Sequence, residues 1–140
     1  MTTQSTRAIV RDIYAAYARR DFDRVAALIH DDIDWIIYGP MQIFPFAGAR
    51  RGKLAVLEAL GGIAKEYQLE RYEPKVIIVE DERAAVMSEV AFKQRSTGRT
   101  MRFMLANFLR VQDGRVIEFR EFANSFDLVE QALGRFIEIA

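Results

Sequence analysis

The chain of 140 residues contains no cysteine, and its only histidine is His30. The first absence excludes disulfides and thiol chemistry, and the second leaves no histidine-rich metal site. Twenty basic and twenty acidic residues cancel, which argues against nucleic acid as a partner held by bulk charge. No apolar run approaches the length of a membrane span. Arg7, Arg11 and Asp12 interrupt the N-terminal stretch before an apolar core of signal-peptide length develops. These features predict a cytoplasmic protein without a nucleic-acid or membrane partner.

The composition that remains is that of an ordinary globular protein. Hydrophobic residues make up 51% of the chain. No repeat, low-complexity segment or long linker divides the sequence. We therefore predict a single domain over residues 1–140, large enough to bury its own core.

Helical patterns come first along the chain and strand patterns follow. Apolar residues recur at helical spacing over residues 4–20, in a short stretch ending near His30, and over 53–68. The inward residues expected in the third helix are Leu54, Leu57, Leu60, Ala64 and Tyr67. Strand patterns cover residues 32–39, 72–81, 84–94, 99–112 and 115–124, with a loop over 40–52. Asn124 is expected to cap a last helix that ends at Gly134. This order predicts the α+β class, with a curved antiparallel sheet wrapped around three N-terminal helices.

The last hairpin decides which side chains share a face. A three-residue loop with Gly114 in the left-handed region pairs Val111 with Arg115. We favour this register because it collects the apolar residues on one face. That face comprises Phe103, Leu105, Asn107, Leu109, Val111, Ile117, Phe119, Glu121 and Ala123. It places Asn107 opposite Phe119 and diagonal to Glu121, within reach of its side chain.

An acid in this apolar row is the main indication of a functional site. Burial raises the pKa of Glu121, and a hydrogen bond from Asn107 to its ionised form lowers that pKa again. A carboxyl tuned in this way suits general acid–base chemistry near neutral pH. In the alternative interpretation, Glu121 pairs with an arginine or a backbone group and is structural. The residues alone leave both interpretations open.

Several aromatic residues are expected to line a pocket around Glu121. Tyr14 either donates to a ligand oxygen from the first helix or packs in the core with its hydroxyl at the rim. Trp35 and Tyr38 alternate on the first strand, and Trp35 is the predicted pocket residue because isoleucines share its face. Phe44 and Phe46 lie in a loop that acts as a lid or covers the core. The remaining predicted lining residues are Phe103, Leu105 and Phe119.

No metal or cofactor site is predicted. Residues 48–53, "GARRGK", lack the Ser or Thr that follows a phosphate-loop lysine, and they are interpreted as a basic loop before a helix. The acidic residues Asp31, Asp32 and Asp34 are interpreted as solvated side chains between a helix and a strand.

The opposite face of the sheet has an apolar centre and a charged rim. Its centre comprises Met104, Ala106, Phe108 and Phe122, among Arg102, Arg110, Glu118 and Arg120. Such a surface predicts a homodimer packed through the outer face of the sheet. In the alternative, residues 135–140 fold over this face within one chain.

The element order and three stretches resemble the ketosteroid isomerase-like, or nuclear transport factor 2-like, superfamily, and most closely its SnoaL-like branch. The stretches are residues 14–35, 45–60 and 111–134. The resemblance implies a cone-shaped α+β barrel whose apolar cavity is open at one end, and often a dimer. Functions in this superfamily include isomerases, polyketide cyclases, epoxide hydrolases, dehydratases and non-catalytic ligand-binding modules, so the fold does not choose among them.

The resemblance carries over residue by residue with two departures. Ketosteroid isomerases have a carboxylate base just before a proline on the first strand, where this chain has Gly39 before Pro40. The SnoaL-like cyclases have an acidic acid/base at the position of Glu121 and a histidine at the position of Asn107. The resemblance thus implies that the carboxyl is kept and the histidine is lost.

Two functional hypotheses remain. In the first, a cofactor-independent enzyme isomerises, cyclises, dehydrates or hydrolyses a small apolar compound that bears oxygen. Glu121 moves the proton, and Asn107 orients or polarises a carbonyl or hydroxyl. In the second, a non-catalytic module binds a small apolar ligand or a protein partner, and Glu121 only forms a hydrogen bond to it.

Overall fold

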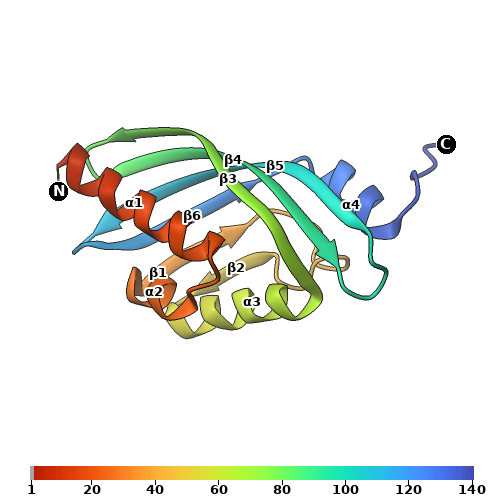
Figure 1. Cartoon of the computed structure of the whole chain (residues 1–140), viewed down its shortest axis with the longest axis horizontal. Helices are drawn as coiled ribbons and strands as arrows, with labels where there is room; N and C mark the ends of the chain where they lie inside the picture. Colours follow the sequence, from red (N-terminus) through yellow and green to blue (C-terminus); the bar gives the residue numbers. More distant parts are fainter. Residues whose placement is uncertain (1) are drawn as a thin grey trace.

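The computed structural model of the chain describes residues 2–140, which form four helices and six strands. Their order is α1 (Thr3–Ala18), α2 (Phe22–Ala27), β1 (Ile29–Ile37), β2 (Gly48–Arg51), α3 (Lys53–Glu66), β3 (Tyr67–Glu80), β4 (Arg83–Gln94), β5 (Thr100–Gln112), β6 (Arg115–Phe122) and α4 (Ser125–Leu133). Figure 1 shows the curved sheet arching over α1, α2 and α3, with α4 at the end of the sheet near the C-terminus.

The six strands form one sheet in the order β2-β1-β6-β5-β4-β3. Neighbouring strands are antiparallel except for β1 and β6, which are parallel. The predicted α+β class is confirmed, and the parallel pair modifies the predicted antiparallel sheet. β1 and β6 are far apart in the chain, so no tight turn forces them to be antiparallel. The sheet is curved and unclosed, with β2 and β3 as its edges.

Irregular pairing bends the long edge strand β3. Its register against β4 shifts between Leu69 and Arg71 and again between Pro74 and Val76. Extra residues of this kind bend a strand and increase its twist. Pro74 is tolerated because an edge strand leaves one side of its backbone unpaired. The bent strand wraps the sheet around α1 and α3, which it contacts.

Of two predictions about the segment before β3, one is wrong and one is right only in part. Residues 48–51 form β2, paired with β1 from Ile37–Gly48 to Asp34–Arg51, where a loop was expected. In α3, Leu60 is buried and Leu57 packs against the core as predicted, but Leu54 is 83% exposed, and the other buried residues are Val56, Ala59 and Ile63. The predicted and the observed sets both have helical spacing, so the contacts with the sheet decide which one is buried.

The last hairpin contains a two-residue turn instead of the predicted three-residue loop. Asp113 and Gly114 both have positive φ, 54° and 73°, which is the conformation that matches the twist of a hairpin. Gln112 therefore pairs with Arg115, and an irregularity between Arg110 and Val111 then shifts the register. The shift keeps Leu109, Phe119 and Glu121 on the predicted inner face, but Val116 faces inward in place of the predicted Ile117, and Asn107 lies directly opposite Glu121 and not opposite Phe119.

The helix termini follow their sequence. The Asn124 side chain accepts a hydrogen bond from the Asp127 backbone N–H at 3.1 Å, and Gly134 ends α4 in the left-handed region, as predicted. The side chain of Gln131 on α4 makes two hydrogen bonds of 2.8 Å to the Arg102 backbone. This contact lies where β5 extends beyond its pairing with β6, and it attaches α4 to the end of the sheet. Over residues 2–140, no helix has both the length and the hydropathy that crossing a membrane would require.

Candidate functional site

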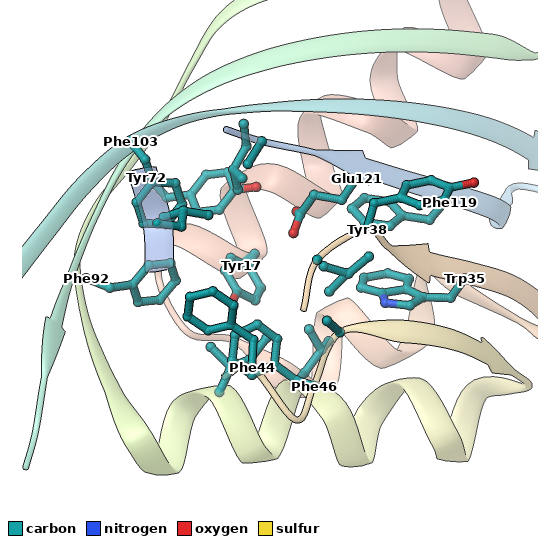
Figure 2. A pocket seen from close by; sticks show the side chains of 18 of the residues that line it. Tyr17, Trp35, Tyr38, Phe44, Phe46, Tyr72, Phe92, Phe103, Phe119 and Glu121 are labelled. Carbon is teal, nitrogen blue, oxygen red and sulfur yellow. The ribbon is translucent and has the colours of Figure 1, made fainter. Parts of the chain in front are cut away.

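A cavity lies between the concave face of the sheet and the helices beneath it (Figure 2). The cavity volume is about 140 Å³. Its walls come from all four helices, the loop between β1 and β2, and five strands, and they are almost entirely apolar and aromatic. Glu121 is the one carboxyl among the lining residues within the described part of the chain.

Eight of the nine predicted site residues line this cavity. They are Tyr14, Trp35, Phe44, Phe46, Phe103, Leu105, Phe119 and Glu121. The ninth, Asn107, is fully buried and lies behind Glu121 without lining the cavity. The structure thus brings all nine together, with Asn107 supporting the wall.

The backbone of Glu121 is held on both sides by β1 and β5. It pairs with Ile37 on one side and with Asn107 on the other, and its carbonyl accepts a hydrogen bond from the Tyr38 N–H at 3.1 Å. The side chain is half-buried and turns toward the cavity in Figure 2. No salt bridge to Glu121 occurs within residues 2–140, so the alternative of an arginine partner is not observed. Arg120, the adjacent residue, pairs instead with Asp34 at 3.2 Å.

The surroundings of Glu121 bring its titration close to neutral pH. Burial disfavours the ionised form and raises the pKa of Glu121 to about 7, against the opposing effect of a hydrogen bond from Asn107. In this bond Asn107 Nδ2 donates to Glu121 Oε1 at 3.1 Å. A carboxyl with this pKa in an apolar cavity can take up or release a proton near pH 7.

A hydrogen bond from Tyr14 orients the amide of Asn107. The Tyr14 hydroxyl donates to Asn107 Oδ1 at 2.6 Å. Burial, followed by the charge of Glu121, raises the pKa of Tyr14 well above its ordinary value, so the hydroxyl stays protonated and remains a donor. With Oδ1 held by Tyr14, the NH₂ group of Asn107 faces Glu121 and stabilises its ionised form. The Tyr14 hydroxyl is therefore bonded within the core, and the Tyr14 ring lines the cavity.

The aromatic wall next to Glu121 is formed by a stacked pair. The rings of Trp35 and Phe119 lie 3.9 Å apart at an angle of 14°. Trp35 is 6% exposed and lines the cavity as predicted. Tyr38, which was not predicted to line it, does so as well, although it is 48% exposed and its ring stacks on Phe122. Trp35 and Phe119 are also direct partners where β1 pairs with β6.

Phe44 and Phe46 pack against the core in the loop between β1 and β2. Their rings lie 5.7 Å apart, and the Phe46 ring meets the edge of Tyr67 at 6.2 Å. Phe44 is 5% exposed. In Figure 2 both rings lie over α3.

The sequence reasoning missed further aromatic and sulfur-containing lining residues, namely Tyr17, Tyr38, Tyr67, Tyr72, Phe92 and Met101. Tyr17 lies one turn after Tyr14 on α1, and this spacing was a usable indication. Phe92 lies two positions from Val90 on β4, and Met101 lies two positions from Phe103 on β5, so each shares a face with an inward residue. This spacing was a second usable indication. Tyr67 was assigned to a helix but begins β3. Tyr72 is placed by the bend of β3, which brings its ring within 5.3 Å of Tyr17.

Two acidic residues of β1, Asp31 and Asp34, are engaged in ion pairs. The exposed side chain of Asp31 lies 3.5 Å from that of Lys53, and the side chain of Asp34 lies 3.2 Å from those of both Arg51 and Arg120. No group of three or more histidine, cysteine, aspartate or glutamate side chains arranged to hold a metal occurs in residues 2–140.

Comparison with known proteins identifies a family and several structural relatives. The model of the SnoaL-like domain family matches residues 10–119. None of the proteins with curated descriptions matches the sequence. A crystal structure of a candidate isomerase from Rhodopseudomonas palustris is 39% identical, covers 96% of this chain and 100% of its own, and superposes with a TM-score of 0.83.

Two more distant structures have the same fold. A nuclear transport factor 2-like protein from Burkholderia xenovorans LB400 is 28% identical, with 94% of this chain and 98% of its own covered and a TM-score of 0.81. An LEH-like epoxide hydrolase from M. tuberculosis is 18% identical, with 94% and 92% covered and a TM-score of 0.77. At this identity the epoxide hydrolase shows a shared fold.

Proposed function

Because the chain belongs to the SnoaL-like domain family, we propose that it is a cofactor-independent enzyme that moves a proton to or from a small apolar organic compound bearing oxygen. Glu121 is the acid or base. The observation that carries this proposal is an isolated carboxyl with a pKa of about 7 in an apolar cavity, hydrogen-bonded to Asn107. The two features expected of an acid–base residue, a raised pKa and contact with Asn107, occur together.

The named relatives support the same elementary step. The protein from R. palustris is described as a candidate isomerase, and the protein from M. tuberculosis as an epoxide hydrolase. In isomerisation a base removes a proton from carbon, and in epoxide opening a base removes a proton from water. Glu121 in its ionised form would serve as the base in either reaction, so the proposal is stated for the proton transfer that they share.

Asn107 has a positioning role in this proposal. Both ends of its amide are occupied, by Tyr14 and by Glu121, and its side chain is fully buried. We therefore propose that Asn107 holds the carboxyl in place, instead of orienting or polarising a ligand carbonyl or hydroxyl as predicted from the sequence. The residues proposed to shape the bound ligand are Tyr14, Trp35, Phe44, Phe46, Phe103, Leu105 and Phe119.

Exchange of α-protons tests the proposal without knowledge of the natural substrate. The probe is 2-tetralone, a flat, uncharged ketone, in D₂O at neutral pD. Ionised Glu121 takes the α-proton, the C–H electron pair forms the C=C bond of an enolate, and deuterium from the exchanged carboxyl returns to carbon. Glu121→Gln should lower the enzyme-dependent exchange rate by roughly 10²- to 10⁴-fold, the usual contribution of a general base.

Glu118→Gln is the matched control, because it makes the same substitution on the other face of β6 and should leave the exchange rate unchanged. Hydrolysis of styrene oxide is the second arm and tests proton removal from water. Equal rates for wild type and Glu121→Gln in both arms would contradict the enzyme. Tight binding of 2-tetralone without acceleration of either reaction would support the binding module in its place.

We also propose that the outer face of the sheet packs against a second copy of the chain. Phe108, Tyr38 and Phe122 are 55%, 48% and 44% exposed, and the Phe122 ring contacts both of the others. Glu118 at the rim pairs with Arg110 at 3.1 Å and with Arg83 at 3.7 Å. A rim that carries both signs of charge can meet itself across a two-fold axis with opposite charges facing.

The alternative cover for this face is not observed. Phe136 and Ile139 of the C-terminal segment are 88% and 80% exposed, so residues 135–140 do not fold over the apolar centre. Sedimentation at micromolar concentration should give a dimer for wild type and a monomer for Phe108→Glu. Phe136→Glu, which adds the same charge on the tail, should remain a dimer. A monomeric wild type would overturn this proposal.

A further inference from the structure

Among residues 2–140, the indole N–H of Trp35 has no hydrogen-bond acceptor. Trp35 is 6% exposed, and its Nε1 is buried without a hydrogen-bond partner. An indole nitrogen can only donate, and buried Trp N–H groups usually find an acceptor because leaving one unpaired is costly. Trp35 lines the cavity, and Figure 2 shows the nitrogen on the ring edge that faces the other lining residues. The cavity wall therefore contains a hydrogen-bond donor that no residue in the described part of the chain satisfies.

The surrounding contacts hold this donor in place. The indole stacks on Phe119 at 3.9 Å and 14°, and the two residues are paired neighbours on β1 and β6. A ring clamped in this way keeps its N–H directed at one region of the cavity.

The position of Trp35 relative to Glu121 follows from the register. Glu121 pairs with Ile37, two residues beyond the Trp35–Phe119 pair on the same face of the sheet. Two residues of a strand span about 7 Å. The cavity wall thus has two polar points along one direction, a fixed donor and a carboxyl, separated by apolar surface.

We propose that Trp35 donates a hydrogen bond from Nε1 to an acceptor oxygen of the ligand, which is a neutral carbonyl, ether or epoxide oxygen. A charged carboxylate would also accept this bond, but its burial beside Glu121 in an apolar cavity is unfavourable. The ligand class is then an uncharged apolar compound whose acceptor oxygen lies at Trp35 while another part reaches Glu121. The part of this assignment that involves Glu121 rests on the function proposed above.

The single tryptophan makes this contact directly observable. A ¹H–¹⁵N correlation spectrum of the labelled protein contains one indole resonance, that of Trp35. Titration with 2-tetralone should move its proton downfield as the hydrogen bond forms. Tetralin, the hydrocarbon with the same ring frame, should bind without that downfield shift and roughly three- to tenfold more weakly, as expected for the loss of one neutral hydrogen bond.

A near-isosteric variant separates the hydrogen bond from ring packing. Incorporation of β-(3-benzothienyl)alanine in a tryptophan auxotroph replaces N–H by sulfur at position 35 alone, because the chain has no other tryptophan. The stack on Phe119 is retained in this variant. Its affinity for tetralin should persist, and the advantage of 2-tetralone over tetralin should disappear. The inference is overturned if the variant keeps that advantage, or if 2-tetralone causes no downfield shift in wild type up to its solubility limit.

This experiment also separates the inference from the proposed enzyme. Glu121→Gln should keep the downfield shift of the indole proton while α-proton exchange is lost. A wild type that shows the shift without exchange supports Trp35 as the ligand donor and contradicts the enzyme. Exchange without the shift supports the enzyme and overturns the role of Trp35.

Discussion

Glu118 and Glu121 lie three residues apart on β6, and the strand turns one to each face of the sheet. Glu118 on the outer face is one-third exposed and has two arginine partners, Arg110 and Arg83. Glu121 on the inner face has no cationic partner among the described residues and contacts an amide that a tyrosine orients. On the outer face, arginines and water stabilise the charge of Glu118. On the inner face, burial leaves the protonated and ionised forms of Glu121 nearly equal in free energy near pH 7. The difference shows that one strand can place two glutamates in unlike surroundings, one paired with arginines and one buried beside an amide.

The pH dependence of 2-tetralone exchange should separate the two carboxyls most clearly. If Glu121 acts as a base with a pKa of about 7, the rate should rise about a hundredfold between pH 5 and pH 8 and level off above that, because only the ionised fraction reacts. Glu118→Gln should have the same profile as wild type. A rate that does not depend on pH in this range would remove the inner carboxyl from the reaction.

Stability should depend on pH through the inner carboxyl as well. The pKa of Glu121 is raised from 4.5 to about 7 in the folded protein. Its contribution to stability is therefore complete below pH 4.5 and is lost as the pH rises through 7. In urea unfolding at pH 8.5, Glu121→Gln should be more stable than wild type by roughly 3 kcal/mol, and the two should converge at pH 4.5.

Glu118→Gln should not show this pH-dependent difference from wild type. It should change the free energy of unfolding by at most about 1 kcal/mol at either pH, as is usual for a surface ion pair. Equal pH dependence in the two variants would mean that the inner face does not treat its carboxyl differently from the outer face.

Removal of the Tyr14 hydroxyl should reveal how far the orientation of Asn107 matters. Tyr14→Phe leaves the buried Asn107 Oδ1 without its donor and should destabilise the fold by about 1–3 kcal/mol. The freed amide can then turn Oδ1 toward Glu121, where it favours the protonated carboxyl, so the midpoint of the pH–rate profile should move to higher pH. Tyr17→Phe, one turn further along α1, removes a cavity hydroxyl that makes no hydrogen bond to Asn107 and should leave the midpoint in place.

The smallest effect is expected on the outer face. Arg110→Gln removes the closer partner of Glu118, and the free energy of unfolding should fall by less than about 1 kcal/mol at low salt and by less still at 0.5 M salt, where the charges are screened. Urea unfolding at two salt concentrations measures this change. A loss above 2 kcal/mol would show that the outer acid depends on its partner as strongly as the inner acid depends on burial.

Much of the fold was readable from local patterns. The first helix, the longer strands, the Asn124 cap and the end of α4 at Gly134 follow from periodicity and from short-range capping, which involve residues a few positions apart. The inward row of β5 and β6 was correct except that Val116 takes the place of Ile117, because the irregularity between Arg110 and Val111 restores, from Glu118 onward, the alternation that the two-residue turn would have reversed. Residues 48–51 were missed because a four-residue edge strand becomes regular only when β1 pairs with it.

The sequence by itself determined that one acid, Glu121, sits in an apolar row with Asn107 nearby, because alternation along a strand is a local property. Only the tertiary structure decided that Tyr14 holds the far end of the Asn107 amide and that, within residues 2–140, no cation pairs with Glu121 and no acceptor meets the Trp35 nitrogen. These facts depend on α1, β1 and β6 meeting across long separations in the chain. Hydrogen-bond partners and burial are set by that meeting, and no pattern within one segment encodes it.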